Sequence, residues 1–244
     1  GEVVAKVEEP IIIVGVGRSG STVFHRILSR HPHVAWLSPL CDRYPDKPSL
    51  NRLLTQMIDI PVIGKGLAVN PSECYGFWEY HCKGFSCPCR DLLAGDVTNR
   101  TKAAVRTAMA KMLTNARSRL LLRVTGWPRI GFLREVFTDA KFIHMVRDGR
   151  AIVNSMISVG FWWGWRGPQN WRYGELTPAQ MEEWDTYDRS FVVLACIEWK
   201  MLMEAVRKAR RLLPTDDFLE VRYEDLCSNH LSVLRSVAEF CNLE

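Results

Sequence analysis

The sequence of 244 residues lacks any apolar run of the roughly 18 residues that a membrane-spanning helix needs. It also lacks a strong excess of charge, since 32 Lys and Arg stand against 27 Asp and Glu, a net charge of +5. Such a mild, scattered excess suits a small anionic ligand but gives no extended basic surface for nucleic acid. No secretory signal, internal repeat or low-complexity tract stands out. We therefore expect neither a membrane-spanning nor a nucleic-acid-binding protein.

Paired metal-binding motifs are also missing. Of eight cysteines, the only close group is Cys82, Cys87 and Cys89, which follow His81. A structural zinc site would need a second spaced pair of ligands. We expect no metal, and thiols that stay reduced as in a cytoplasmic protein.

Short apolar runs alternate with amphipathic segments along the chain. Strands are expected at 11–16, 33–37, 120–124, 142–146 and 218–223. Helices are expected at 21–30, 101–117, 129–137, 148–158, 178–213 with a break near 188–190, and 230–241. Residues 39–100 suggest short helices and loops. This alternation predicts a three-layer α/β fold, with a parallel central sheet between helices on both faces, as a single domain over 1–244.

The most informative segment is 10–30, PIIIVGVGRSGSTVFHRILSR. An apolar run typical of a strand buried on both faces leads into three glycines, and Ser21 and Thr22 then open an amphipathic helix. Backbone N–H groups and the positive end of the helix dipole converge at such a turn. The pattern therefore predicts a site for a phosphate or sulfate, and hence for a phosphorylated nucleotide. The alternative is a glycine turn that only packs a helix on a sheet.

Two familiar nucleotide loops fit this segment poorly. The dinucleotide fingerprint GxGxxG needs an acidic residue about 20 positions on, and that region reads HVAWLSPL. The triphosphate loop needs a lysine after its last glycine, where this chain has Ser21. The positive charge instead lies inside the turn, at Arg18. A nucleotide kinase-like enzyme remains an alternative, weakened by the missing lysine.

A second anion motif lies in 141–157, KFIHMVRDGRAIVNSMI. An apolar strand ends at Arg147, and Ser155 follows on the next helix. An arginine and a hydroxyl placed in this way can hold one phosphate by charge and by hydrogen bonding.

Together the two segments resemble sulfotransferases that use 3′-phosphoadenosine 5′-phosphosulfate (PAPS). The second motif is most similar to protein-tyrosine sulfotransferases, with bacterial and carbohydrate enzymes close behind. The resemblance implies that the first turn holds the 5′-phosphosulfate, through Arg18, Ser19, Gly20, Ser21 and Thr22. It implies that Arg147 and Ser155 hold the 3′-phosphate. A late strand in LEVRYEDL adds Tyr223 beside the nucleotide.

The resemblance also implies catalytic roles. Arg18 lies where cytosolic relatives have a lysine that stabilises the leaving oxygen, and Arg123 lies where relatives have a basic residue facing the sulfuryl group. Several relatives place a catalytic Glu shortly after an HPxV element, but here that place reads AWLSPLCD. The remaining candidates for the base are Glu79 and His81, and then Asp42.

The acceptor is not specified by these motifs. An aromatic segment at 161–173 suggests either an acceptor pocket or a small hydrophobic core. We expect a small-molecule, glycan or carrier-bound acceptor, with PAPS as donor and PAP as product. A protein that binds the nucleotide without catalysis is the second alternative. Relatives usually continue with a segment that closes over the nucleotide, which this sequence does not show. The expected compartment is the cytoplasm, or the Golgi lumen if a membrane anchor precedes the domain.

Overall fold

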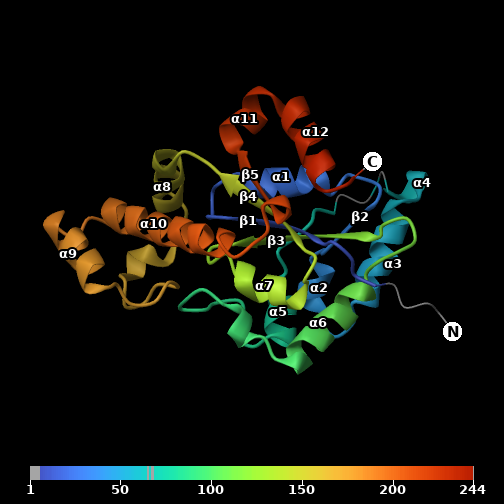
Figure 1. Cartoon of the computed structure of the whole chain (residues 1–244), viewed down its shortest axis with the longest axis horizontal. Coiled ribbons are helices and arrows are strands. Elements are labelled where there is room, and N and C mark those ends of the chain that lie inside the picture. Colours follow the sequence, from blue (N-terminus) through green and yellow to red (C-terminus); the bar gives the residue numbers. More distant parts are fainter. Residues whose placement is uncertain (1–5, 65, 67–68, 244) are drawn as a thin grey trace.

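The computed structural model describes residues 6–64, 66 and 69–243. In these residues five parallel strands form one sheet in the order β2-β3-β1-β4-β5 (Figure 1). The strands are β1 (Ile11–Gly15), β2 (Val34–Trp36), β3 (Arg119–Thr125), β4 (Lys141–Val146) and β5 (Phe218–Arg222). Every residue of β1 is buried, as expected for a central strand covered on both faces.

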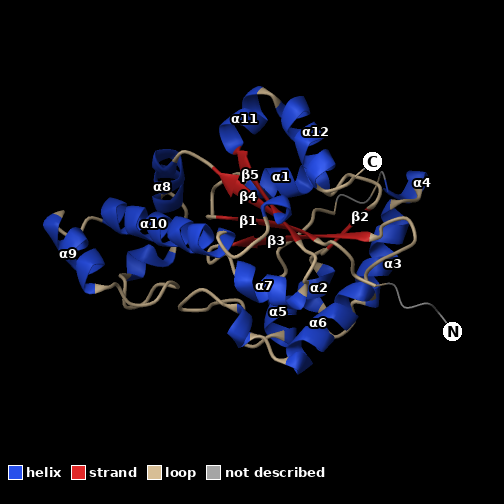
Figure 2. Ribbon diagram, viewed as in Figure 1, coloured by secondary structure: helices blue, strands red, loops and turns tan. Residues whose placement is uncertain are grey.

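Helices connect these strands (Figure 2). In chain order they are α1 (Ser21–Leu28), α2 (Leu40–Arg43), α3 (Ser49–Ile58), α4 (Pro61–Gly64), α5 (Tyr75–His81), α6 (Asn99–Ala110), α7 (Ile130–Val136), α8 (Gly149–Ile157), α9 (Pro178–Thr186), α10 (Phe191–Arg210), α11 (Tyr223–Ser228) and α12 (His230–Phe240). Three short 3₁₀ turns are η1 (Ala94–Asp96), η2 (Trp163–Arg166) and η3 (Thr215–Asp217).

The alternating side chains of β1 divide the core into two layers. Ile12 and Val14 face α5, α6 and α7, together with the last turns of α10. Ile11 and Ile13 face α1, α11 and α12. Figure 1 shows these two groups of helices on opposite sides of the sheet. The expected three-layer α/β architecture is confirmed.

Some boundaries differ from those expected. The long helical segment is broken as expected, because Asp188 and Arg189 both have positive φ between α9 and α10. The helix expected over 101–117 ends earlier, since α6 stops at Ala110. The last strand ends at Arg222, and Tyr223 begins a further helix, α11, that the sequence reading missed.

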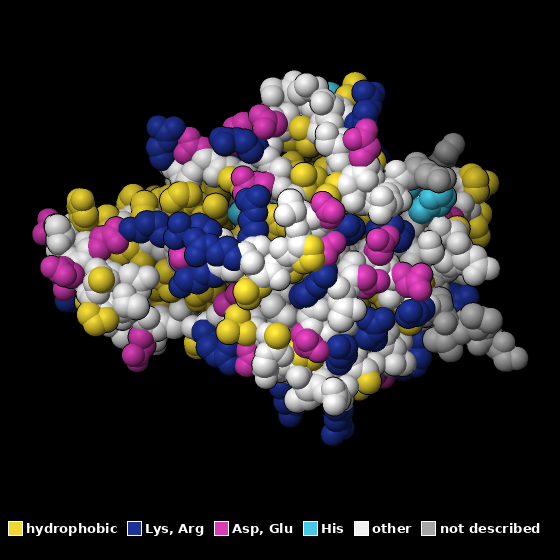
Figure 3. Space-filling model, viewed as in Figure 1, with side chains coloured by type: hydrophobic (Ala, Val, Ile, Leu, Met, Phe, Trp, Pro, Cys, Tyr) yellow, Lys and Arg dark blue, Asp and Glu magenta, His cyan; other side chains and the backbone are white. Residues whose placement is uncertain are grey.

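Helix α10 separates apolar from charged side chains. Its buried positions include Leu194, Ile197 and Leu202, while Arg207, Lys208 and Arg210 occupy its last turns. Figure 3 shows Lys and Arg side chains gathered along this helix on the viewed face. Basic groups near a helix C-terminus offset the negative end of the helix dipole.

Within the described residues, every helix is too short or too polar to cross a membrane.

The sheet register aligns the strand ends that form the site. Gly15 pairs with Thr125 on β3 and with Met145 on β4, and Val146 pairs with Arg222 on β5. The segments that follow β1, β3, β4 and β5 therefore leave the sheet along one edge. In open parallel sheets, ligands bind outside this carboxyl edge.

Candidate active site

The turn between β1 and α1 concentrates polar groups at the carboxyl edge. Gly20 precedes the helix with a φ of +91°, and a Cβ atom built there would lie 2.2 Å from Cδ2 of Tyr223. Both the backbone conformation and the packing therefore require glycine. Ser19 is fully buried, and its hydroxyl has no hydrogen-bond partner among the described residues. Ser21 is also buried at the start of α1. The turn thus combines a helix N-terminus with an unpaired hydroxyl.

Arg18 and Arg147 tie this turn to helix α8 and to the residue that follows β4. The Nε atom of Arg18 donates to the hydroxyl of Ser155 at 2.8 Å, and Nη1 of Arg147 donates to the backbone oxygen of Arg18 at 3.0 Å. The guanidinium of Arg147 lies 4.6 Å from the centroid of the Tyr223 ring. Neither arginine forms an ion pair with a carboxylate of the described chain. The structure thus brings together four residues expected at the nucleotide, with their positive charges unpaired.

Arg123 connects the turn to a carboxylate. From β3, its Nη1 donates to the hydroxyl of Thr22 at 2.5 Å. Its Nη2 lies 3.7 Å from Oε2 of Glu73, and the two side chains are only 11% and 17% exposed. Oε1 of Glu73 in turn lies 3.5 Å from the hydroxyl of Tyr75. Burial raises the pKa of Tyr75, and the charge of Glu73 adds to the rise. A cation and an acid therefore stand side by side next to the turn.

Glu73 is a site residue that the sequence reading missed. The backbone nitrogen of Ser72 donates to the oxygen of Leu37 at 2.8 Å. The chain therefore returns, after α2, α3 and α4, to the end of β2. Glu73 lies close in space to the place after β2 where the resemblance led us to look for a base, although it is distant in sequence. No local pattern reports this return; the only local signal is an acid just before the aromatic helix α5.

The three bases expected from the sequence have other partners. Asp42 accepts hydrogen bonds from two backbone N–H groups at the start of α5. Partial burial on its own raises the pKa of Glu79. Hydrogen bonds from the backbone N–H groups of Gly84 and Ser86 and from the Ser86 hydroxyl outweigh this effect, so that the pKa is lowered. The Nε2 atom of His81 lies 3.1 Å from the oxygen of Pro45, and burial lowers the pKa of this imidazole. None of these three side chains lines the cavity beside Glu73.

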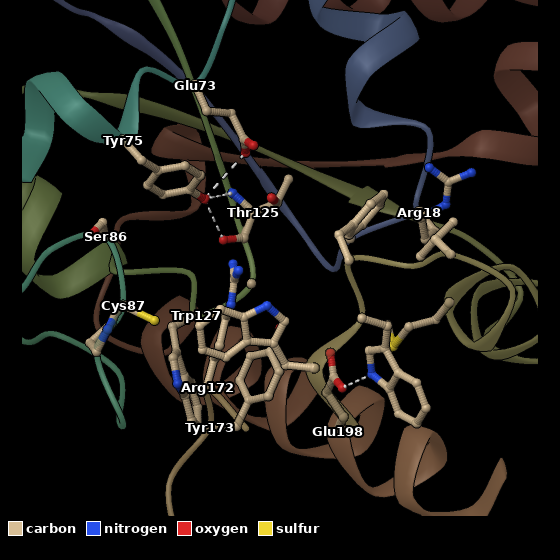
Figure 4. A pocket seen from close by; sticks show the side chains of 18 of the residues that line it. Arg18, Glu73, Tyr75, Ser86, Cys87, Thr125, Trp127, Arg172, Tyr173 and Glu198 are labelled. Carbon is tan, nitrogen blue, oxygen red and sulfur yellow. Dashed lines mark hydrogen bonds between the residues drawn. The ribbon is translucent and has the colours of Figure 1, made fainter. Parts of the chain in front are cut away.

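That cavity has a volume of about 240 Å³ and lies between Arg18, Glu73 and the aromatic segment (Figure 4). Its walls include six rings, those of Tyr75, Trp127, Phe161, Trp162, Trp163 and Tyr173, and the side chains of Arg129 and Arg172 also line it. Other parts of the same segment form a small core, in which Trp171 packs with Trp184 of α9. The aromatic segment therefore both lines a cavity and contributes to a small core; that the cavity takes the acceptor stays a prediction.

Glu198 of α10 lies at the opposite end of the cavity from Glu73 (Figure 4). Its side chain is 2% exposed, and Oε2 accepts a hydrogen bond from Nε1 of Trp162 at 2.6 Å. Burial raises the pKa of Glu198 to about 7, against hydrogen bonds from Trp162 and Tyr173 and the charge of Arg172. The sequence reading missed this residue as well. The available signal was an acid on the buried face of a helix, one turn after Leu194 and one before Leu202.

Comparison with known proteins agrees with this architecture. The profile of the sulfotransferase family matches residues 10–244, so the chain belongs to the sulfotransferase family. No curated protein matches the chain.

Solved structures show the same fold at low sequence identity. Sulfotransferase STF1 of Mycobacterium tuberculosis H37Rv superimposes with a TM-score of 0.61 at 16% identity, covering 98% of this chain and 69% of that one. Sulfotransferase STF9 of Mycobacterium avium gives 0.61 at 17% identity, covering 98% and 65%. A sulfotransferase domain from the curacin biosynthetic pathway gives 0.54 at 13% identity, covering 98% and 75%. This chain thus spans about two thirds of the length of the two mycobacterial proteins.

Proposed function

We propose that the protein transfers a sulfuryl group from PAPS to a hydroxyl or amine acceptor. Membership of the sulfotransferase family supports sulfuryl transfer. The observation that carries the choice of donor is the convergence of Arg18, Arg147 and Ser155, from two segments that are far apart in the sequence. One anion site on each segment suits a ligand that carries phosphate at two ends, such as an adenosine bisphosphate.

The residues present fit such a nucleotide. Anionic oxygens would pair with the guanidinium groups of Arg18 and Arg147, which have no carboxylate partner, and with the unpaired hydroxyl of Ser19. When bound, PAPS supplies a sulfuryl group on a phosphate leaving group. We assign Arg18 and 19–22 to the phosphosulfate end. Arg147 and Ser155 are assigned to the 3′-phosphate, with Tyr223 packed against Arg147.

Arg123 and Glu73 are assigned to the transfer itself. Sulfuryl transfer, like phosphoryl transfer, depends mainly on positioning and on stabilising charge that develops on oxygen. Arg18 and Arg123 provide positive charge beside the turn. Glu73 accepts the proton of the acceptor hydroxyl as general base, since it is the acid that lies next to Arg123 and lines the cavity.

The test is to incubate the protein with PAPS and a panel of hydroxyl and amine acceptors, and to measure PAP release and sulfated product. We expect acceptor-dependent PAP release that needs no Mg²⁺. Turnover of Mg²⁺-ATP in place of PAPS would instead favour the kinase-like alternative. Tight PAP binding without transfer to any acceptor would favour a binding protein.

A further inference from the structure

The cavity beside Glu73 is small and has aromatic walls. A cavity of roughly 150 Å³ with apolar walls encloses one benzene molecule, so about 240 Å³ suits a single ring with a short substituent. Trp127 and Tyr173 lie with their ring centroids 6.0 Å apart, and Figure 4 shows both rings between Glu73 and Glu198. Ring faces of this kind attract cations as well as apolar groups.

The far end of the cavity contains a buried acid without a cationic partner. Glu198 forms no ion pair with any Lys, Arg or His of the described chain. Its contacts are hydrogen bonds from neutral donors, the indole of Trp162 and the hydroxyl of Tyr173. Fully buried carboxylates are almost always paired with a positive charge. Burial raises the pKa of Glu198 to about 7, and the hydrogen bonds from these neutral donors do not offset it.

Three arginines line the cavity, Arg18, Arg129 and Arg172, and Arg172 is the one whose charge acts on the pKa of Glu198. Its guanidinium lies 4.1 Å from the ring centroid of Trp163, and its side chain is exposed. The charge of Arg172 lowers the pKa of Glu198, but by less than burial raises it. Arg172 therefore does not neutralise Glu198, and a cation that enters the cavity can.

We propose that Glu198 binds an ammonium group of the acceptor, so that the preferred acceptor is a compact aryl alcohol with its hydroxyl at Glu73 and an amine at the other end. This proposal rests on the proposed function, because it takes Glu73 as the reacting end. The carboxylate of Glu198 and the rings of Trp127, Trp162 and Tyr173 would surround the ammonium. Glu198 therefore selects the acceptor, and Glu73 takes the proton that is transferred.

The test uses phenols that differ in one group: tyramine with an ammonium, p-cresol and N-acetyltyramine without charge, and 4-hydroxyphenylacetate with a carboxylate. The kcat/KM of each is measured with PAPS, and the Kd of each for PAP-loaded protein is measured by calorimetry. The kcat/KM of tyramine should be about tenfold or more higher than that of both neutral phenols, and its Kd about tenfold or more lower, as one buried ion pair predicts. Glu198→Gln should remove this preference and leave p-cresol within about twofold of its wild-type value.

Glu204→Gln is the matched control, since Glu204 lies on the same helix and pairs with Arg207 at the surface; it should retain the preference. Equal affinity of the wild type for tyramine and N-acetyltyramine would overturn the proposal without the need for any variant. An equal loss for every phenol in Glu198→Gln would overturn it in favour of a structural role. Tightest binding of 4-hydroxyphenylacetate would overturn it in favour of Arg172. If other acceptors are sulfated but no phenol is, this proposal is overturned and the proposed function stands. If no acceptor of the wider panel is sulfated, the proposed function fails, and the Kd values still decide the ammonium question.

Discussion

Arg18 and Ser155 are 137 positions apart in the sequence and share a hydrogen bond of 2.8 Å. This contact joins the turn after β1 to helix α8, the two segments that carry the anion motifs. Arg147 adds a second link through the backbone oxygen of Arg18. The two halves of the proposed nucleotide site therefore support each other through the protein's own hydrogen bonds, and such preorganisation reduces the ordering that binding requires.

Arg147→Ala should weaken PAP binding by about 10- to 100-fold, because charge-assisted hydrogen bonds to phosphate contribute about 1.5–3 kcal/mol. Isothermal calorimetry with PAP measures this directly. Arg150→Ala is the control: Arg150 follows closely in the chain, but its side chain is 93% exposed and pairs with Asp148. Unchanged PAP affinity in Arg147→Ala would refute the assignment of the 3′-phosphate site.

Glu73→Gln should lower kcat by about 10²-fold or more, the usual contribution of a general base, while PAP affinity stays within about twofold. Single-turnover assays with PAPS separate the two effects. Glu79→Gln should keep kcat and lose some stability, because the carboxylate of Glu79 holds 84–86. The opposite result, with kcat lost in the Glu79 variant alone, would return the role of base to that residue.

Gly20→Ala should destabilise the protein by about 1–3 kcal/mol, since the new Cβ would need both a positive φ and space that Tyr223 occupies. Thermal unfolding with and without PAP measures the loss. Gly17→Ala, in the same turn, is the control, because a Cβ there meets no atom within 4 Å. Combining Gly20→Ala with Tyr223→Ala should restore part of the stability; no recovery would mean that the φ angle alone causes the loss.

Glu198 should make stability depend on pH. Its pKa is about 7 in the folded protein against an ordinary value of 4.5, so the folded state binds more protons between these two values. Stability should therefore fall as pH rises from about 4.5 to about 7, by up to about 3 kcal/mol, and this contribution should then stay constant at higher pH.

Denaturant titrations of the wild type and Glu198→Gln across this range provide the measurement. The variant should lack this component of the pH dependence and be the more stable protein at pH 8. Parallel curves for the two proteins would show that Glu198 titrates normally in the folded state.

The parts of the site that were predicted from the sequence are those with a local signal. The buried run and glycine turn at 11–20 and the strand end at Arg147 are readable because the neighbouring residues alone determine the backbone there. Local periodicity also indicated the layers of the fold. By contrast, the place of Glu73 in the site depends on where the chain returns after three helices. The place of Glu198 depends on which segments cover one face of α10. These are tertiary facts, so spacing and composition did not reveal them.

The hydrogen bond from Ser72 to Leu37 brings the chain back to the end of β2 and so closes a long loop in the sequence. The entropic cost of closing a loop rises only slowly with its length. The loop can therefore be longer or shorter in related proteins while Glu73, which follows it, keeps its place. A search for this acid in distant homologues should therefore anchor on the strand edge to which the chain comes back. An alignment that counts residues from the HPxV element will place this acid wrongly in any homologue whose loop has a different length.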